Sequence, residues 1–428
     1  MNEEEIKNNE SCLLVIAGGQ GTRLWPISHK DCPKQFTLVN PNESFIQATV
    51  KRYYEVGVKP ERVFVITTNA RQHELAVEHL RSLGVLEPNI IKFPSKYGYA
   101  GCMVKGAEFI AKYFPNSCVI NTPADQYIDM KNEASRKGFL GVMATAIKNA
   151  GAGNPTIVGL KGIEREAFRG LGHASYNPSE EGECRKVLDF IEKPKDDDLI
   201  DDMIRGGYTA ANTGINVWRI QDIKKASKGI DFTHGEVGTD TLMNKLKATG
   251  KLQIAIGKFG WKDCGTLKAL LDITPKTGEH HNNAILGKGN FIAERDNCRN
   301  TLLYTLEGIE LYGYNLRNVS VVVNTIGDIT YIVVVAHEYA QEVRELVDRF
   351  DANKKWIEDS YTLHGMNNFV VPSNISHEFK VGFVGVSNIR VSTTKTSERK
   401  LRVENGADID VPGRTIVQVS YDERAAMH

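Results

Sequence analysis

A glycine-rich segment near the amino terminus carries the residues best suited to bind phosphate. Residues 17–23 read Ala-Gly-Gly-Gln-Gly-Thr-Arg and follow four apolar residues that predict a short buried strand. Glycine adopts positive φ easily and lets bare backbone N–H groups approach a ligand, so such a loop can form an anion-binding nest. Arg23 and Lys34 would add the positive charge that a triphosphate needs. The first chemistry that the sequence suggests is therefore phosphate binding.

Two common phosphate-binding motifs do not fit this loop. A dinucleotide-binding fingerprint would place its third glycine at position 24, where the chain has Leu24. A P-loop would close with Gly-Lys-Ser or Gly-Lys-Thr, which this segment does not contain. The competing interpretation is a tight strand-to-helix turn whose glycines only relieve backbone strain.

The loop and the residues after it resemble the signature of the nucleoside-diphosphate-sugar pyrophosphorylases, or sugar-1-phosphate nucleotidyltransferases. That signature is Gly-Gly-x-Gly-Thr-Arg-Leu followed by Pro-Lys, and mannose-1-phosphate guanylyltransferases add Trp-Pro-x-Ser and Pro-Lys-Gln-Phe. Here residues 25–28 read Trp-Pro-Ile-Ser and residues 33–36 read Pro-Lys-Gln-Phe. The resemblance extends over residues 11–350 and is closest to the mannose-1-phosphate guanylyltransferases.

The resemblance also implies roles for the residues of the loop. Arg23 would take the charge that grows on the leaving pyrophosphate, and Lys34 would hold phosphate near the reacting centre. Backbone N–H groups of the loop would cradle the nucleotide. The nucleotide-binding residues predicted in this way are Ala17, Gly18, Gly19, Gly21, Thr22, Pro94 and Gly98.

Two aspartates follow predicted strands and could hold a cation. Asp125 comes after an apolar run and Pro123, and on these residues alone a turn or helix-capping role suits it. The family carries Pro-Ala-Asp-His at this place and Trp-x-Asp-x-Gly later, and both aspartates bind its metal. This chain has Gln126 instead of the histidine, and Asp263 in the second motif. The resemblance therefore implies a Mg²⁺ site at Asp125 and Asp263, because Mg²⁺ usually takes one or two carboxylates plus phosphate oxygens and water.

Further motifs resemble the part of the family that binds the sugar phosphate. Residues 168–173 resemble the family's Gly-Tyr-Gly-Tyr and contain Gly172, and residues 190–194 resemble Phe-x-Glu-Lys-Pro. A carboxylate at Glu192 can accept hydrogen bonds from sugar hydroxyls, and an ammonium at Lys193 can balance the sugar phosphate. Adjacent residues of a regular strand face opposite ways, so both can line one pocket only if the chain bends near Pro194. The alternative is a solvated Glu-Lys pair at a strand end.

The sugar side continues at residues 211–216, which resemble the family's Trp-Asn-Ser-Gly-Ile-Phe and contain Asn212 and Gly214. An amide at position 212 can both donate to and accept from a hydroxyl-rich ring. The family's tryptophan is Ala211 here. A polyol with a different outline from mannose could therefore fit.

The loop that would bind the base departs from the guanylyltransferase pattern. Guanylyltransferases read Glu-Pro-x-x-Arg-Asn-Thr-Ala-Pro-Ala, and only Pro94 and Ala100 match in this chain. The pattern Pro-Ser-x-x-Gly-x-Ala resembles thymidylyltransferases as much. Guanine presents N–H donors, and the side chain of Phe93 cannot accept a hydrogen bond. For Tyr97 and Tyr99, packing is the simpler interpretation than base stacking.

The elements that must position these residues follow a recognisable order. Up to residue 160, short apolar runs alternate with helical stretches at 71–83, 99–113 and 133–149, which predicts an α/β fold with a mostly parallel sheet and helices on both faces. Ligands bind at the carboxyl ends of such strands. The family resemblance makes this a Rossmann-like, GT-A-like catalytic domain over residues 1–285.

Beyond Gly287 the sequence changes to short β runs, at 301–304, 309–312, 319–323 and 331–335, followed by a predicted helix at 339–350. Residues 286–350 resemble the small β-helix-like region of guanylyltransferases, which in the family supports dimer contacts. A homodimer or higher homo-oligomer is the corresponding prediction. Residues 351–428 form an additional β-rich extension.

The composition excludes several other partners. Lys plus Arg and Asp plus Glu both number 53, so no long-range field favours nucleic acid or an anionic membrane. The acidic amino terminus and the lack of a long apolar run argue against a signal peptide or membrane span. The seven cysteines are scattered and suit reduced thiols, so we expect a soluble cytoplasmic protein. His280 and His281 suit a loop better than a metal pair.

Together the motifs predict transfer of a nucleotidyl group from an NTP to a sugar 1-phosphate, with release of pyrophosphate. GTP and mannose 1-phosphate are the favoured pair. The alternatives within the same chemistry are CTP, UTP or dTTP and another phosphorylated sugar or polyol. A catalytically silent subunit that binds an NDP-sugar is the alternative from another class, although such a subunit has no chemical need for both metal carboxylates.

Overall fold

The computed structural model describes most of the first 343 residues and several strands beyond them. The described ranges are 9–19, 24–94, 97–232, 237–277, 282–287, 298–305, 309–314, 316–341, 343, 360–363, 379–384, 389–395, 399–402, 408–411 and 415–421. Three predicted site residues, Gly21, Thr22 and Arg23, lie outside them, as do His280, His281 and most of the helix predicted at 339–350. The chain divides into two compact units, the first of residues 1–18 and 45–262 and the second of residues 19–44 and 263–428.

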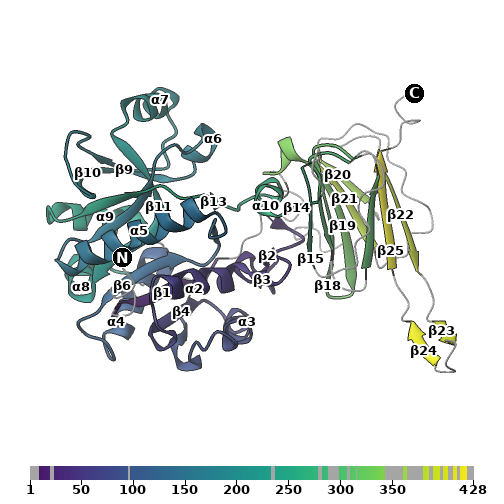
Figure 1. The fold of residues 1–428 in the computed structure, drawn as a ribbon, viewed down its shortest axis with the longest axis horizontal. Helices are drawn as coiled ribbons and strands as arrows, with labels where there is room; N and C mark the ends of the chain where they lie inside the picture. The colour runs from purple at the N-terminus through teal and green to yellow at the C-terminus, as the bar shows by residue number, and fades with distance from the viewer. Residues whose placement is uncertain are drawn as a thin grey trace. The chain divides into compact units, whose positions relative to one another are not determined.

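A nine-stranded sheet forms the centre of the first unit (Figure 1). Its strands in spatial order are β5 (Ile90–Lys92), β4 (Val63–Thr67), β1 (Cys12–Ile16), β6 (Cys118–Pro123), β11 (Thr209–Arg219), β8 (Thr156–Leu160), β12 (Gln253–Gly257), β10 (Cys184–Glu192) and β9 (Gly172–Tyr176). Strands β5, β4, β1 and β6 run parallel to one another. This part of the sheet agrees with the predicted order of strands and helices.

The rest of the sheet is mixed, which corrects the prediction of a mostly parallel sheet. Strand β11 runs antiparallel to both β6 and β8, and β10 runs antiparallel to β12 and β9. Strands β9 and β10 are joined by residues 177–183 alone, and a connection that short cannot cross over to a parallel neighbour. The alternation of strands and helices that suggested parallel pairing ends with β8.

Helices cover both faces of this sheet, as predicted. The three helices expected from the sequence are α3 (Ala70–Arg81), α4 (Gly98–Ile110) and α5 (Glu133–Gly151). Side chains of Asn69 and Asn132 cap α3 and α5 by accepting hydrogen bonds from backbone N–H groups, which explains where these helices begin. Helix α4 packs against β1 and β4 and contacts α8 (Ile220–Ser227) and α9 (Thr239–Ala248), which pack against β11 and β10, while α5 packs against β8, β11 and β12. The remaining helices of this unit are α2 (Phe45–Glu55), α6 (Arg165–Phe168) and α7 (Asp197–Gly206).

Two larger sheets form the second unit. One has the order β14 (Lys276–Thr277), β15 (Asn283–Gly287), β16 (Leu302–Thr305), β18 (Val319–Ile326), β19 (Ile329–Ala336), β21 (Phe379–Val384) and β20 (Ser360–Leu363). The other has the order β17 (Ile309–Tyr314), β25 (Thr415–Tyr421) and β22 (Ile389–Lys395). Valines 391, 417 and 419 of the smaller sheet pack with β18 and β19 in one buried core. The strands predicted at 301–304, 309–312, 319–323 and 331–335 are therefore confirmed.

Strands β15, β16 and β18 stack in parallel with a constant step of 18 residues. Ala284 lies opposite Leu302, and Leu302 lies opposite Ser320. Asn282, Asn300 and Asn318 repeat with the same step, all have φ between 50° and 56°, and each donates its side-chain amide to the next along the stack or accepts from the one before. Asparagine is one of the few residues that adopt this left-handed conformation readily. The 18-residue repeat thus places a regular ladder of asparagines beside the stacked strands, a feature that was not predicted from the sequence.

The unit also contains β2 (Leu38–Asn40), β3 (Glu43–Ser44) and α10 (Leu267–Ile273). Figure 1 shows them beside the first strands of the larger sheet, where β2 packs against β15 and α10 against β16 and β18. Within the described ranges, no helix combines the length and the apolar character needed to cross a bilayer.

Candidate active site

An ion pair between a buried lysine and a partly exposed aspartate joins the first and the last of the predicted motifs. The Nζ atom of Lys34 lies 3.1 Å from Oδ1 of Asp263, although the two residues are 229 positions apart. The Lys34 side chain is 5% exposed and that of Asp263 is 43% exposed. A buried ammonium needs a negative or polar partner, and Asp263 supplies one. The second unit therefore brings together two residues to which the sequence assigned catalytic roles.

The short helix that carries Lys34 also contacts the glycine-rich segment. It spans Lys34–Phe36, and Pro33 before it has the φ of −62° that suits the start of a helix. Gln35 donates a hydrogen bond from Nε2 to the carbonyl oxygen of Gly19, at 3.2 Å. Thr37 donates to the carbonyl oxygen of Lys34 at 2.7 Å and so closes the turn. Gly19 and Lys34, both predicted to act on the nucleotide, are thus held on one local scaffold.

In the first unit, the start of the loop packs against the end of β4. Ala17 donates its N–H to the carbonyl oxygen of Ile66 at 2.8 Å, which extends the β1–β4 pairing by one residue. A Cβ atom added to Gly18 would lie 2.6 Å from Cγ2 of Thr68, so only glycine fits there. Thr68 also donates to the carbonyl oxygen of Gly18 at 3.3 Å. Close packing is therefore one reason for this glycine, independent of any ligand.

Asp125 stands at the carboxyl end of the parallel strands, where ligands bind in sheets of this kind. Strand β6 ends at Pro123, and Ala124 donates its N–H to the carbonyl oxygen of Ile16 at the end of β1, at 3.1 Å. Burial raises the pKa of Tyr99 above its usual value, and the negative charge of Asp125 raises it further. Tyr99 therefore keeps its proton, which it donates to the carbonyl oxygen of Gly214 at 3.2 Å.

The residue after Asp125 links three segments of the first unit. The Gln126 amide donates through Nε2 to the carbonyl oxygen of Thr213 and accepts through Oε1 from Nε1 of Trp261 at 3.1 Å. Arg52 donates to the backbone carbonyl of Gln126 at 3.0 Å. In the sequence, Gln126 stands out only as a substitution for the family's histidine, and its spacing gives no sign of this bridge. The bridge fixes the chain next to Asp125 against the segment that holds Asn212.

Asn212 and Gly214 form an irregular turn within β11. Pairing with β8 shifts register between Asn212 and Asn216, and the side chain of Asn212 accepts a hydrogen bond from the N–H of Gly214 at 2.9 Å. Gly214 has φ of 77°, and a Cβ atom there would lie 3.0 Å from Cγ of Pro123. The glycine is therefore required by both conformation and space. Ala211 is buried beside this turn.

Glu192 and Lys193 lie side by side because the chain bends where β10 ends. Lys193 has φ of 43°, a left-handed conformation that strand residues do not adopt, and its N–H donates to the carbonyl oxygen of Leu171 at 3.1 Å. Its Nζ atom lies 3.6 Å from Oε1 of Glu192. Gly172 pairs with Glu192, and a Cβ atom on it would lie 2.5 Å from Oε2 of Glu192. The bend that the sequence analysis required near Pro194 is present one residue earlier.

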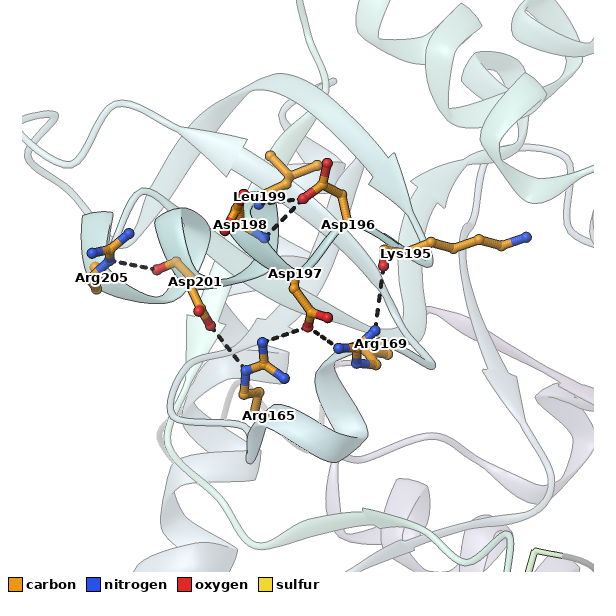
Figure 2. A network of polar contacts seen from close by, with 9 residues as sticks. All are labelled: Arg165, Arg169, Lys195, Asp196, Asp197, Asp198, Leu199, Asp201 and Arg205. Atoms are coloured by element: carbon orange, nitrogen blue, oxygen red, sulfur yellow. Dashed lines mark hydrogen bonds and ion pairs between the residues drawn. The ribbon is translucent and has the colours of Figure 1, made fainter.

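A network of charged side chains connects the two segments that flank this bend (Figure 2). Asp197, the first residue of α7, accepts hydrogen bonds from Arg165 at 2.6 Å and from Arg169. Arg165 also donates to Asp201 at 3.0 Å, and Arg169 donates to the carbonyl oxygen of Lys195. The two arginines hold the Asp197 carboxyl pKa below its usual value, with Arg165 the larger cause. The network, which the sequence analysis missed, holds the segment before Gly172 to the segment after Lys193.

In strand β9, His173 is buried and stacks on Phe168 with 3.6 Å between ring centroids. Its Nε2 lies 2.8 Å from the carbonyl oxygen of Phe168, so in this arrangement the ring donates through Nε2. Burial lowers the His173 pKa. A neutral histidine therefore ties the start of β9, which contains Gly172, to Phe168.

The base loop is built around an aromatic pair. Phe93 and Tyr97 meet edge to face with 6.2 Å between their centroids, and both pack against the core beneath α4. Phe93 is fixed by its backbone N–H, which donates to the carbonyl oxygen of Thr67 at 2.8 Å. Gly98 begins α4 with φ of 59°, and Pro94 is exposed. The contacts show Tyr97 in a packing role.

The comparison with known families decides the assignment of these motifs. Residues 13–280 match the model of the nucleotidyl transferase family, which is more than half of the chain. The chain belongs to the nucleotidyl transferase family. The matched range includes every predicted site residue, from Ala17 to Asp263. The protein is accordingly a nucleotidyltransferase, and its sequence is similar to mannose-1-phosphate guanylyltransferases.

Relatives of this nucleotidyltransferase are recognisable over most of the chain. The xanthan biosynthesis protein XanB of Xanthomonas campestris pv. campestris is 25% identical over 78% of this chain and 72% of its own length. The mannose-1-phosphate guanylyltransferase RfbM of Salmonella typhimurium is 24% identical over 80% of this chain and 73% of its own length. A crystal structure described as mannose-1-phosphate geranyltransferase from Thermus thermophilus covers 80% of this chain and 99% of its own, with 23% identity and a TM-score of 0.59. That last similarity supports the fold.

The residues of this nucleotidyltransferase that could hold a metal are carboxylates. Asp263 is partly exposed and its ion pair with Lys34 uses Oδ1, so Oδ2 can face a cation. The described residues contain no cluster of three or more His, Cys, Asp or Glu side chains that could hold an ion. A donor set of few carboxylates suits Mg²⁺, which takes its remaining ligands from phosphate and water. Asp125 belongs to the first unit and Asp263 to the second, so their joint role stays a prediction.

Proposed function

We propose that this nucleotidyltransferase transfers a nucleotidyl group from an NTP to a sugar 1-phosphate, with GTP and mannose 1-phosphate as the favoured pair. The observation that carries the proposal is the ion pair between the buried Lys34 and the partly exposed Asp263. Each belongs to a motif that resembles the guanylyltransferases, and the two motifs lie at opposite ends of the predicted catalytic domain. The names of the relatives support the same substrates.

The reaction needs no protein nucleophile. A phosphate oxygen of the sugar 1-phosphate attacks the α-phosphorus of the NTP, the bond from the α-phosphorus to the bridging oxygen breaks, and pyrophosphate leaves. Such transfers depend mainly on positioning and on stabilising charge. Arg23 takes the charge that develops on pyrophosphate, Lys34 holds phosphate at the reacting centre, and the N–H groups of Gly18 and Gly19 bind the nucleotide.

The residues proposed to bind the sugar 1-phosphate, here called the acceptor side, have two roles: some bind its phosphate and others bind its hydroxyl groups. Lys193 orients the phosphate of the sugar 1-phosphate, and Glu192 beside it accepts hydrogen bonds from hydroxyl groups. Asn212 offers an amide to the ring, although its oxygen already accepts from Gly214. Gly172 leaves room for Glu192. Ala211 gives a wider wall than tryptophan would, which favours trials with other polyol phosphates.

Asp125 and Asp263 would hold Mg²⁺. When bound, the ion would neutralise phosphate charge around the α-phosphorus. We also propose that residues 286–350 form a β-helix-like domain, for which the 18-residue step of β15, β16 and β18 is the support, and that residues 351–428 extend it. A homodimer or higher homo-oligomer is the proposed assembly.

The base is the part of the proposal with a specific competitor. Phe93 cannot accept a hydrogen bond from guanine through its side chain, and with Tyr97 it forms an apolar edge-to-face pair. CTP, UTP and dTTP are therefore competing candidates for the nucleotide substrate and are tested alongside GTP. Reading of guanine here would have to use backbone carbonyl groups.

The test is pyrophosphate release with Mg²⁺ across GTP, ATP, CTP, UTP and dTTP, each combined with mannose 1-phosphate and a panel of other sugar and polyol phosphates. Release fastest with GTP and mannose 1-phosphate supports the full proposal. Release with a different pair keeps the reaction and replaces the substrates. Failure of the whole panel with folded protein contradicts the proposed reaction.

A matched pair of variants separates an enzyme from a silent binding subunit. Asp263→Asn removes a proposed metal ligand, while Asp328→Asn changes an exposed aspartate in the turn between β18 and β19 of the same unit. We expect Asp263→Asn to abolish turnover and Asp328→Asn to leave it unchanged. Equal activity of the two variants would contradict the metal role of Asp263.

A further inference from the structure

The turn end of the β18–β19 hairpin carries an unusual buried pair. Asn324 of β18 and Tyr331 of β19 lie directly opposite each other, and they are only 4% and 3% exposed. The next residue toward the turn, Thr325, is exposed. The end of a hairpin is normally open to water, so something must cover this pair, and a buried amide needs a hydrogen-bond partner.

Two residues from the amino-terminal part of the second unit provide that cover. The Trp25 ring meets Tyr331 edge to face, with 4.9 Å between centroids and 68° between ring planes. Asn324 donates through Nδ2 to the carbonyl oxygen of Pro26. Trp25 is itself 4% exposed. One contact is an aromatic pair and the other is a buried hydrogen bond. Trp25 and Pro26 are therefore held both by packing and by a directional polar contact.

These contacts lie next to the residues that the proposed reaction uses on the nucleotide. Trp25 is two residues after Arg23 in the sequence, and Gly19, four residues before Arg23, accepts a hydrogen bond from Gln35. The chain is therefore anchored on both sides of Arg23. Helix α10, which starts four residues after Asp263, packs against β16 and β18 of the same sheet. The sheet thus supports both segments that meet in the Lys34–Asp263 pair.

We propose that Asn324 and Tyr331 are positioning residues for nucleotide binding. They hold Trp25 and Pro26 so that the segment with Gly19 and Lys34 meets the triphosphate in one arrangement. This inference rests on the proposed function, because it assumes that the loop binds the NTP. It gives the carboxyl-terminal sheet an indirect role in substrate binding, in addition to the subunit contacts expected from the family resemblance.

The first test measures steady-state kinetics of full-length variants. Asn324→Leu removes the donor at similar volume, and Tyr331→Leu removes the ring. Each should lower kcat/KM for the NTP by about tenfold or more, since about 1.4 kcal/mol corresponds to tenfold and a buried hydrogen bond is worth that order. The KM for the sugar phosphate should stay within about twofold, because its proposed contacts lie elsewhere.

Three matched variants show whether the effect follows the contacts. Thr325→Val changes the exposed neighbour of Asn324 and should match the wild type. Asn324→Gln keeps an amide donor and Tyr331→Phe keeps the ring, so each should recover part of what the leucine variant loses. An equal rise in KM for both substrates, with a lower Tm, would show only general destabilisation and would overturn the proposal.

The second test needs no turnover. Trypsin cleaves after arginine, and the rate of cutting between Arg23 and Leu24, followed by mass spectrometry on folded protein, reports how firmly Trp25 and Pro26 are held. We expect cutting to speed up several-fold in Asn324→Leu and Tyr331→Leu and not in Thr325→Val. Unchanged cutting together with unchanged kcat/KM for the NTP overturns the inference.

Direct NTP binding separates failure of this inference from failure of the proposed function. If the wild type binds NTP without turnover on any acceptor, the proposed reaction fails, and weaker binding by Asn324→Leu still supports the positioning role. If the wild type turns over and the leucine variants match it, the proposed function stands and the positioning role fails. If no NTP binds, both fail.

Discussion

The two sides of the proposed site are built in different ways. On the nucleotide side, Lys34 is 5% exposed and its partner Asp263 comes from 229 residues away. On the acceptor side, Lys193 is 63% exposed and its partner is the adjacent Glu192. The charged partner of Lys34 comes from a distant segment of the chain, whereas the segments around Lys193 are joined by a surface network of arginines and aspartates (Figure 2).

The difference suggests a division of work between the two sides. A charge held in a buried, prearranged position acts through a low local dielectric and needs no reorganisation during the reaction, so it can stabilise the transition state strongly. An exposed ion pair contributes little by itself, because water screens it and its side chains stay mobile. We therefore expect the nucleotide side to set kcat and the acceptor side to set the affinity for the sugar phosphate.

The largest effect should follow from removing the buried charge. Lys34→Met should lower kcat by about 10³-fold, the size seen when a prearranged charge-stabilising donor is lost, with little change in KM for the sugar phosphate. Lys268→Met, at a half-exposed lysine on α10 of the same unit, is the control and should leave kcat unchanged. A loss below tenfold in Lys34→Met would contradict the proposed division of work.

The second prediction concerns acid and the sheet that supports the nucleotide side. Burial and, to a smaller extent, Lys268 lower the pKa of His337 from 6.5 to about 4, while its ring nitrogens lie near Ser320 and Asn300. The stability that this neutral histidine provides is complete above pH 6.5 and is lost as the pH falls toward 4. At about 1.4 kcal/mol per pH unit, the loss approaches about 3 kcal/mol.

Urea unfolding between pH 7 and 4 checks this, with His337→Gln as the variant. The free energy of unfolding of the wild type should fall more steeply in this window than that of the variant. Parallel curves for the two proteins would mean that His337 does not carry the pH dependence.

On the acceptor side, the third prediction tests whether space for Glu192 matters. Gly172→Ala places a Cβ atom 2.5 Å from Oε2 of Glu192 and 2.8 Å from Cζ of Phe190, so the carboxylate must move. We expect the KM for the sugar phosphate to rise by about tenfold, with kcat within a factor of about three, since about 1.4 kcal/mol of binding is lost. Gly141→Ala in α5, where no described atom lies within 4 Å of the added Cβ, is the control. A larger effect on kcat than on KM would place Glu192 in the chemical step.

The smallest effect is expected from the surface network. Replacing Arg165 and Arg169 together by glutamine should raise the KM for the sugar phosphate by about two- to threefold, because exposed ion pairs contribute on the order of 1 kcal/mol or less. The difference from the wild type should shrink at high salt, which screens these charges. Arg71→Gln removes an exposed pair on α3 and should have no effect on KM. If the KM for the NTP changed and the KM for the sugar phosphate did not, the network would not act on sugar-phosphate binding as predicted.

The sequence alone determined the reaction class and most of the local structure. The segment from Leu13 to Phe36 carried enough specific residues to indicate a nucleotidyltransferase, and the family match over residues 13–280 confirms it. Helices α3, α4 and α5 and strands β16 to β19 were predicted because apolar spacing acts over a few positions. The sequence also indicates that Glu192 and Lys193 can share a pocket only if the chain bends near Pro194, and the structure has such a bend at Lys193.

Only the tertiary structure decided which distant residues meet. The antiparallel course of β10 and β11, the bridge made by Gln126 and the pairing of Lys34 with Asp263 depend on contacts between residues far apart in the chain. The cover that Trp25 and Pro26 give to Asn324 and Tyr331 joins residues about 300 positions apart. Short-range patterns carry no information about such pairs, because register and partner choice follow from the packing of whole elements. The reaction class could therefore be predicted from local motifs, but the tertiary contacts that position those motifs could not.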